Sequence, residues 1–288
     1  MTCESCGNPK GKAAFCSHPT NHLDGADLPR SVNKEPIFSA SQIDTFMSCA
    51  RKWAWDRIAH KPRPQNRSAA LGTRCHTQLE QYLAHGRPLQ ETLDDGSPDE
   101  TAAIVRPALP LLPAAQATGL EVEKSFAFRS PRTGFTYRGF IDFRMSGPGA
   151  NWCTVGDHKS TSNLSYAKTP GDLLYDPQAI IYSVDSMAYY QVPNVHLMWS
   201  YMQTKGAKRH LPVYQDMTQP HVGEAFAAIE ETAGEMKLIL DTVDAGGILG
   251  MYPDGVDKGT CTAYGGCPFV GECNLGPKER MGSLFAGL

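Results

Sequence analysis

The sequence lacks a strong charge of either sign and the density of cysteine that marks a disulfide-stabilised protein. Its 27 Lys and Arg against 30 Asp and Glu give a formal net charge of −3, so the overall charge does not point to a nucleic-acid partner. Nine Cys in 288 residues are too few for a disulfide scaffold. With 41% hydrophobic and 20% charged residues, the composition is that of a globular protein and excludes a wholly disordered or collagen-like chain.

Long apolar runs are missing as well. A membrane-spanning helix needs about 18 or more apolar residues, and the most apolar stretch, residues 108–115, is interrupted by Pro110 and Pro113. The first residues show no apolar signal segment, so we expect a cytoplasmic protein with no membrane partner. In a reducing compartment, an odd number of cysteines favours metal ligands or buried thiols over disulfides.

Three cysteines lie within residues 261–273, where two glycines and a proline disfavour a regular helix. We therefore expect a loop that folds around a ligand, formed by Cys261, Cys267 and Cys273. Three thiolates do not complete the four-thiolate set of an iron–sulfur cluster, and the best candidate for the fourth is Cys49. The spacing alone leaves three alternatives open: an iron–sulfur cluster, a zinc ion that also binds a histidine, or free thiols.

A second group of metal-ligand types lies at the N-terminus. Its members are Cys3, Cys6, Cys16 and His18, which resemble half of a zinc ribbon. The alternative is a tail with incidental cysteines. We expect residues 1–36 to form a separate appendage and residues 37–288 to form the main domain.

The hydrophobic pattern predicts an α/β layer with a mixed sheet. Expected helices cover residues 41–58, 71–84, 101–118, 177–190 and 222–243. Expected strands cover residues 122–128, 135–145, 152–159, 194–203 and 208–214. Asp176 and Pro177 suit the N-cap and the first position of the fourth helix, and a capping-box-like pair, Ser41 and Asp44, suits the start of the first.

Two acidic residues stand on strands that follow each other in the chain. Asp157 and Lys159 project from one face of the third strand, because side chains alternate along a strand, and Asp142 on the second strand can converge on them. Neighbouring carboxylates repel each other unless a cation lies between them, and Mg²⁺ prefers carboxylate oxygens. This combination suits metal-assisted phosphodiester hydrolysis, whereas a simple ion pair between Asp157 and Lys159 is the alternative.

Four short motifs stand in a consistent order. They are Gly72-x-x-x-His76, Gly139-Phe140-Ile141-Asp142, Asp157-His158-Lys159 and Gln178-x-x-x-Tyr182. With the cysteines, this order resembles the PD-(D/E)XK nuclease superfamily over residues 38–276, and specifically its RecB-like exonuclease branch. That branch includes the nuclease domain of the AddB subunit and the CRISPR-associated RecB-like exonucleases. The resemblance implies a restriction-endonuclease-like core, a mixed central sheet flanked by helices.

The resemblance also implies roles for individual residues. Mg²⁺ or Mn²⁺ would be bound by His76, Asp142, Asp157 and the backbone carbonyl of His158. Lys159 would be the catalytic lysine, and Gln178 and Tyr182 would position it, the water or the DNA strand. Cys49, Cys261, Cys267 and Cys273 would hold a [4Fe–4S] cluster that joins the two ends of the nuclease core. Five residues between Cys261 and Cys267, instead of the usual two, depart from the family pattern.

Local charge reconciles an acidic chain with a DNA substrate. Residues 51–74 carry seven Lys or Arg against Asp56 alone, a local charge of +6. The candidate DNA-binding residues are Arg51, Lys52, Trp55, Arg57 and Arg74, with Trp55 placed to stack on unpaired bases. Solvated helix charges are the alternative reading of this segment.

These observations favour a metal-dependent DNA exonuclease that prefers single strands or DNA ends. We expect it to act in recombination, repair or phage DNA processing, with a helicase, recombinase or replication protein as a partner. One alternative is a nuclease of the CRISPR-adaptation type that trims spacer precursors. Another is an inactive DNA-binding subunit with a structural metal.

Overall fold

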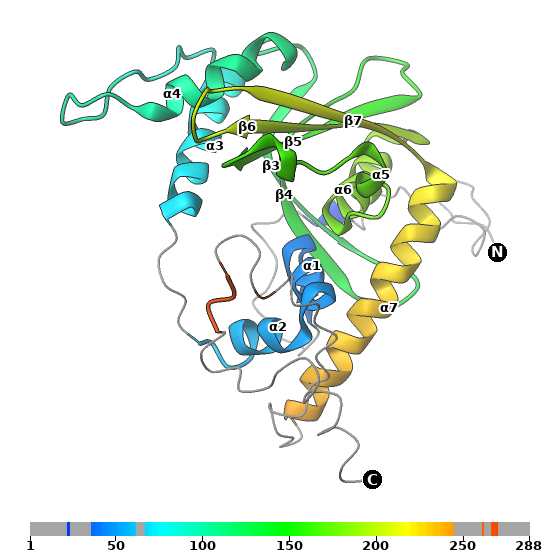
Figure 1. Cartoon of the computed structure of the whole chain (residues 1–288). Helices are drawn as coiled ribbons and strands as arrows, with labels where there is room; N and C mark the ends of the chain where they lie inside the picture. Colours follow the sequence, from blue (N-terminus) through cyan, green and yellow to red (C-terminus); the bar gives the residue numbers. More distant parts are fainter. Residues whose placement is uncertain (1–21, 24–35, 62–66, 245–260, 262–265, 270–288) are drawn as a thin grey trace. The chain divides into compact units, whose positions relative to one another are not determined.

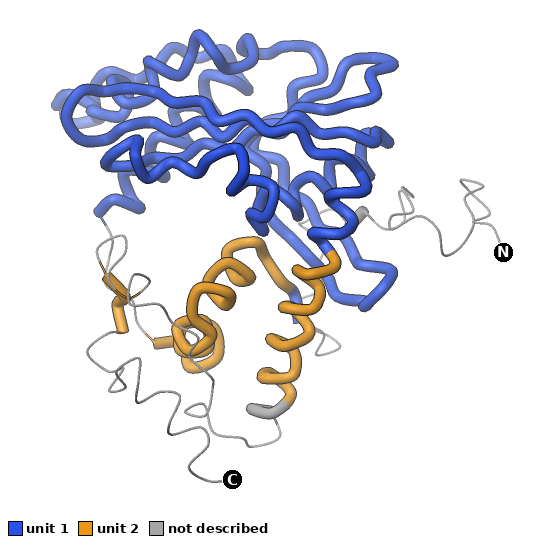
Figure 2. The backbone as a smooth tube through the Cα atoms, turned by 45° about the vertical axis from the view of Figure 1, so that its right-hand side comes forward, with its two compact units in different colours: residues 1–37, 66–226 blue, residues 38–65, 227–288 orange. Residues whose placement is uncertain are grey.

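The computed structural model describes residues 22–23, 36–61, 67–244, 261 and 266–269. The chain divides into two compact units, each assembled from segments that are distant in sequence (Figure 2). Unit 1 consists of residues 1–37 and 66–226, and unit 2 of residues 38–65 and 227–288. The expected appendage of residues 1–36 stays a prediction, because most of it lies outside the described residues.

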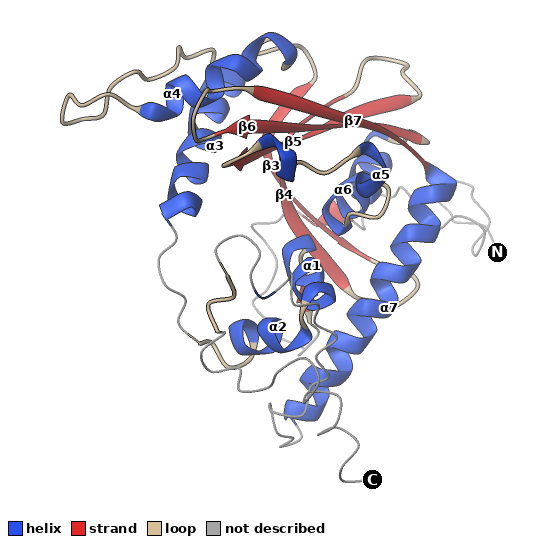
Figure 3. Cartoon of the chain, viewed as in Figure 1, coloured by secondary structure: helices blue, strands red, loops and turns tan. Residues whose placement is uncertain are grey.

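Unit 1 is built on a seven-stranded sheet with the order β1-β3-β4-β5-β6-β7, from which the short β2 pairs separately with β4 (Figure 3). The strands are β1 (His22–Leu23), β2 (Ile37–Phe38), β3 (Leu120–Arg129), β4 (Thr136–Met145), β5 (Trp152–Thr161), β6 (Asn194–Gln203) and β7 (His210–Thr218). Strands β5 and β6 are parallel, whereas β3–β4, β4–β5 and β6–β7 are antiparallel. The predicted mixed central sheet flanked by helices is confirmed.

The parallel pair β5–β6 needs a crossover, because a tight turn cannot join parallel strands. That connection contains η3 (Leu164–Tyr166), α5 (Pro170–Leu173) and α6 (Pro177–Tyr190). As predicted, Asp176 caps α6: its carboxylate accepts a hydrogen bond from the Gln178 N–H at 2.8 Å, and Pro177 follows at the first helical position. Gln178, in the first turn of α6, contacts Asp157 and Lys159, so the helix starts close to the end of β5.

The two faces of the sheet in unit 1 carry different helices (Figure 1). On one face, α3 (Arg67–His85), α4 (Glu100–Val105) and η2 (Arg106–Leu111) bury a core that includes Leu79, Ile104, Phe143 and Met198. On the other face, α6 meets β5 and β6, as Gln178 does with Asp157 and Tyr182 does with Trp199. The helix expected over residues 101–118 is shorter, because prolines in the 106–111 segment cannot donate the hydrogen bonds of a continuing α-helix.

Unit 2 contains α1 (Ala40–Ser48), α2 (Ala50–Arg57) and most of α7 (Gln219–Asp244). The single helix expected over residues 41–58 is wrong: Cys49 has an extended backbone, with φ −167° and ψ 105°, and separates α1 from α2. Its sulfur accepts a hydrogen bond from the Lys52 N–H at 3.4 Å and so caps α2. The N-cap of α1 is Ser39 instead of Ser41, since the Ser39 hydroxyl accepts the Gln42 N–H.

Aromatic contacts organise unit 2. The Trp53 side chain is 1% exposed and meets Phe46 edge-on, with ring centres 5.3 Å apart. Trp55 meets the buried Phe269 in the same way at 5.5 Å, so residues from both sequence segments of this unit touch. In the described part of the chain, no helix combines the length and the apolar character that a membrane span needs.

Candidate active site

Strands β4 and β5 separate at a buried carboxylate. Their ladder ends at the pair Phe143–Gly156, and one residue further the Asp142 carboxylate accepts a hydrogen bond from the backbone N–H of His158 at 2.5 Å. Gly156 has no room for a side chain, because a Cβ there would lie 1.9 Å from the Phe143 ring. The ring of Phe143 thus packs over the backbone that precedes Asp157.

Helix α3 brings a histidine to this carboxylate. The helix approaches β5 at Gly72, where a Cβ would lie 2.9 Å from the Ser160 hydroxyl. One helical turn later, His76 Nδ1 lies 3.4 Å from Asp142 Oδ1. The absence of a side chain at Gly72 thus lets α3 pass close to Ser160 of β5.

A network joins the end of β5 to α6. The Lys159 ammonium lies 2.5 Å from the Asp157 carboxylate and donates to the Gln178 side-chain carbonyl at 2.7 Å. The Gln178 amide nitrogen donates to Asp157 at 2.6 Å and to the Tyr182 hydroxyl at 2.8 Å. Gln178 and Tyr182 lie one turn apart on α6. Through Gln178, this helix fixes the positions of the Asp157 and Lys159 side chains.

Burial and mutual repulsion set the charges of the site. Burial raises the pKa of the Asp157 carboxyl to about 7, and the neighbouring Asp142 charge adds to this, while the Lys159 ammonium opposes it. Burial acts to lower the pKa of His76, but the neighbouring Asp142 and Glu123 carboxylates outweigh it and raise that pKa to about 10. Burial lowers the pKa of His158 to about 4, so its ring is neutral at pH 7 and packs on Phe143.

The donor set fits a divalent cation. Ligand atoms of His76, Glu123 and Asp142 lie within 4.8 Å of one another. Among the described residues, these three side chains form the group of His, Cys, Asp or Glu that could hold a metal ion. Asp142 and Asp157, 6% and 1% exposed, are two carboxylates buried together, which is unfavourable without a compensating positive charge. In the structure, the Lys159 ammonium supplies that charge beside Asp157, and the protonated His76 ring supplies it beside Asp142, where a cation would replace the proton.

The chemistry of such a site follows from its residues. A bound Mg²⁺ or Mn²⁺ would polarise a phosphate and promote ionisation of a water molecule. Asp142, Asp157 and His76 would hold the ion, together with the carbonyl of His158. The Lys159 side chain is 32% exposed, and its ammonium can donate to a phosphate oxygen on which negative charge develops.

The structure thus brings together all seven residues predicted for the cation and for catalysis. They are His76, Asp142, Asp157, His158, Lys159, Gln178 and Tyr182, all in unit 1. It also adds Glu123, which the sequence reasoning missed. Its carboxylate lies 3.9 Å from His76 Nδ1. No motif includes Glu123, and with Glu121, Lys124 and Ser125 in the same strand its charge does not stand out, so no sequence signal marked it.

The predicted DNA-binding residues are divided between the two units, whereas the network lies in unit 1. Arg51, Lys52, Trp55 and Arg57 belong to unit 2, whereas Arg74 belongs to unit 1 and lies 3.7 Å from the Asp99 carboxylate. Within unit 2, the Lys61 ammonium lies 4.4 Å from the centre of the Trp55 ring, and the Arg51 guanidinium lies 5.9 Å from it. Their contact with DNA stays a prediction.

The cysteines divide between the two units. Cys49, Cys261 and Cys267 belong to unit 2, where the Cys267 N–H donates to the Cys261 carbonyl at 2.8 Å. The remaining predicted ligands, Cys3, Cys6, Cys16, His18 and Cys273, lie outside the described residues. Cys75 and Cys153 are buried, and burial raises their pKa values to about 11 and about 12, which suits core thiols and disfavours metal ligation.

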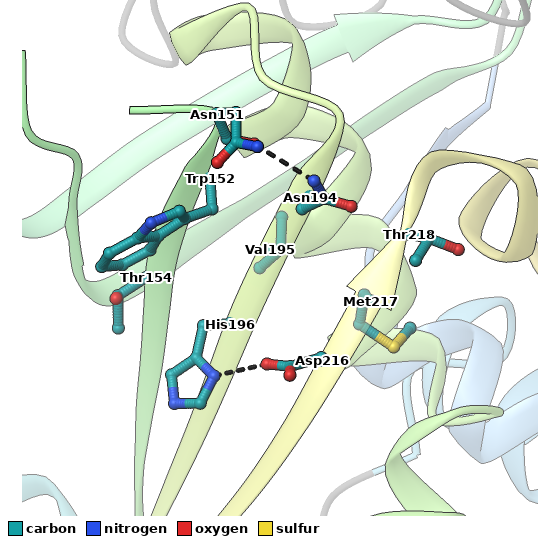
Figure 4. Close-up of a pocket in the computed structure, with 9 residues that line it drawn as sticks. All are labelled: Asn151, Trp152, Thr154, Asn194, Val195, His196, Asp216, Met217 and Thr218. Carbon is teal, nitrogen blue, oxygen red and sulfur yellow. Dashed lines mark hydrogen bonds and ion pairs between the residues drawn. The ribbon is translucent and has the colours of Figure 1, made fainter. Parts of the chain in front are cut away.

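A separate cavity of about 600 Å³ lies where β5 and β6 begin and β7 ends (Figure 4). Trp152 lines it, and His196 Nδ1 lies 2.5 Å from the Asp216 carboxylate across the strands. It contains none of the residues of the network at the other end of β5.

Comparison with known proteins identifies relatives of the chain. The family model described as the PD-(D/E)XK nuclease superfamily matches residues 37–274, which include the whole network. A candidate exonuclease from Eubacterium rectale has a similar structure, with a TM-score of 0.50 at 12% sequence identity over 92% of this chain and 99% of that chain. The protein SSO0001 aligns with a TM-score of 0.36 at 10% identity over 70% of this chain and 79% of that chain. No curated protein matches.

Proposed function

The chain belongs to the PD-(D/E)XK nuclease superfamily, and on that premise we propose that it is a metal-dependent DNA exonuclease. The observation that carries the proposal is the Asp157–Lys159–Gln178 network beside Asp142. It combines two carboxylates suited to a hard cation with a lysine held in place to meet a phosphate. An ordinary surface ion pair would not need the two additional hydrogen bonds that the Gln178 side chain of α6 forms with Asp157 and Lys159.

Each residue of the network has a defined task in this proposal. Asp142 and Asp157 bind the cation, and His76 completes the ligand set from α3. Lys159 donates to the phosphate, while Gln178 keeps its ammonium and the Asp157 carboxylate in place through one side-chain amide. Positioning of this kind contributes to the rate because the reacting groups need not be reorganised during the reaction.

We also propose that the enzyme attacks DNA ends and belongs to the RecB-like branch. The resemblance of the motifs supports this, as does the exonuclease description of the Eubacterium rectale relative, which we extend here to this chain. A [4Fe–4S] cluster held by Cys49 and the cysteines of residues 261–273 forms part of the proposal. Its support is that Cys49, Cys261 and Cys267 fall in the same compact unit although more than 200 residues separate Cys49 from the other two.

The test uses end-labelled linear DNA, single- and double-stranded, beside a covalently closed circle. With Mn²⁺ or Mg²⁺, the proposal predicts that linear DNA is degraded from its ends, that the circle stays intact and that EDTA stops the reaction. Asp157→Asn and Lys159→Met should each reduce the rate by at least a hundredfold.

The exposed pair Lys237 and Asp241 on α7, 2.6 Å apart, supplies matched controls. Lys237→Met and Asp241→Asn remove the same chemical groups and should leave the rate unchanged. Degradation that survives both active-site substitutions would reject the site, and cutting of the closed circle would reject the exonuclease assignment. Binding of DNA without any cleavage would favour the inactive DNA-binding subunit instead.

A further inference from the structure

Glu123 has a backbone conformation that is rare for a residue with a side chain. It lies within β3 with a φ of 48°, in the left-handed region. Its neighbours pair normally with β4, Val122 with Phe143 and Lys124 with Ile141, whereas Glu123 has no ladder partner. The β3–β4 ladder is therefore interrupted at a single position, where Glu123 lies opposite Asp142 and neither residue is paired.

The Glu123 carboxylate lies beside His76, the histidine predicted to bind the cation. Its oxygen lies 3.9 Å from His76 Nδ1, and the same nitrogen lies 3.4 Å from Asp142 Oδ1. The side chain of Glu123 is 30% exposed, so it is accessible to an ion and to water. Among the described residues it has no other ion-pair partner, so its carboxylate is directed to the His76 side of Asp142.

Asp157 is placed differently. It is engaged by Lys159 and Gln178, on the side of Asp142 that faces α6. The ligand atoms that lie within 4.8 Å of one another are those of His76, Glu123 and Asp142, without Asp157. The geometry therefore offers a cation a carboxylate that none of the four motifs contains.

We propose that Glu123 is a further ligand of the divalent cation in this site and that its left-handed backbone conformation is retained because it delivers the carboxylate there. The inference rests on the proposed function, since it concerns the same cation. An added carboxylate oxygen increases the affinity of a site for hard ions such as Mg²⁺ and Mn²⁺. Backbone strain of this kind persists where the surrounding structure and function require it.

The test measures Mn²⁺ binding without DNA, by calorimetry and by the electron paramagnetic resonance signal of free Mn²⁺, on the full chain. Glu123→Gln keeps the size of the side chain and should weaken Mn²⁺ binding about tenfold or more, as loss of a ligand does. Glu224→Gln, which removes an exposed carboxylate from α7, is the matched control and should bind Mn²⁺ like the wild type. Wild-type affinity in Glu123→Gln would overturn the proposal.

A pair of variants tests the backbone part of the proposal. Glu123→Gly and Glu123→Ala both lack the carboxylate, but only glycine adopts a φ of 48° without strain. Both should bind Mn²⁺ more weakly, and Glu123→Gly should melt about 2–4 °C above Glu123→Ala. Equal melting temperatures would show that the backbone of Glu123 is not strained and would overturn this part.

The binding test also separates this inference from the proposed function. If the wild type cleaves DNA while Glu123→Gln binds Mn²⁺ normally, the inference fails and the nuclease assignment stands. If Mn²⁺ binding depends on Glu123 while the wild type cleaves no DNA, the nuclease assignment fails and the ligand assignment stands.

Discussion

The Asp142 carboxylate accepts a hydrogen bond from the backbone N–H of His158 at 2.5 Å, at the point where β4 and β5 stop pairing. The bond replaces the next rung of the ladder, so the side chain of one strand satisfies a backbone group of the other. It holds Asp142 beside the residue that separates Asp157 from Lys159. Where the two strands stop pairing, the Asp142 carboxylate is thus fixed next to the segment of β5 that carries Asp157 and Lys159.

Gln178 is expected to act by holding two other residues in place. Gln178→Met removes the hydrogen bonds to Asp157 and Lys159 and should lower the single-turnover cleavage rate by about 10- to 100-fold, with little change in Mn²⁺ affinity. Tyr182→Phe removes only an acceptor for the Gln178 amide and should lower the rate by less than tenfold. A Gln178→Met variant that cleaves at the wild-type rate would contradict this role.

Gly156 is expected to be intolerant of any side chain. Gly156→Ala puts a methyl group into the space of the buried Phe143 ring and should destabilise the protein by about 1–3 kcal/mol, a drop of several degrees in melting temperature. Gly147→Ala is the matched control, because a Cβ there meets nothing within 4 Å. Thermal unfolding compares the two variants, and equal stability would show that Phe143 does not constrain Gly156.

The ion pair between Arg144 and Glu121 is expected to make the free energy of unfolding depend on pH in the acidic range. Arg144 is completely buried, and its Nε donates to the Glu121 carboxylate at 2.6 Å. Burial acts to raise the pKa of Glu121, but the Arg144 charge lowers it below its ordinary value of 4.5. The unfolded state then binds the proton more readily, so this stabilisation is complete at neutral pH and is lost as the pH falls through the folded pKa.

Urea unfolding of Glu121→Gln measures that contribution. The variant should be less stable than the wild type by about 1–3 kcal/mol at pH 7, and the difference should shrink as the pH falls below 4.5. Glu224→Gln, at an exposed position, should show no such trend. A difference that stays constant or grows on acidification would contradict the assignment of Glu121 as the ionised partner of Arg144.

Cys49 is expected to bind iron. Protein purified without oxygen should contain iron and absorb visible light, and Cys49→Ser should lose both, because three thiolates remain. The variant keeps a side chain that caps α2 well, so its helix should be retained. Cys153→Ala, at a buried position, should keep the iron. A colourless wild-type protein that contains zinc would reject the cluster.

Local patterns allowed much of the site to be predicted from the sequence. Asp142, Asp157 and Lys159 were found because strand alternation is strictly periodic, and the start of α6 because Asp176 and Pro177 carry the chemistry of a helix start. The break at Cys49 was missed because apolar spacing continues on both sides of it. The left-handed φ of Glu123 could not be predicted, because it depends on packing around a residue that does not itself favour that conformation.

We infer that α3, β4 and β5 bring His76, Asp142 and Asp157 together as one cation site. Anomalous diffraction at the manganese edge, from crystals of the full chain soaked in Mn²⁺, tests it most directly. We expect a peak within about 2.5 Å of the Asp142 carboxylate, with His76 and Asp157 as further ligands and no peak there in Asp142→Asn. A manganese ion bound elsewhere, with this site empty at saturating Mn²⁺, would contradict it.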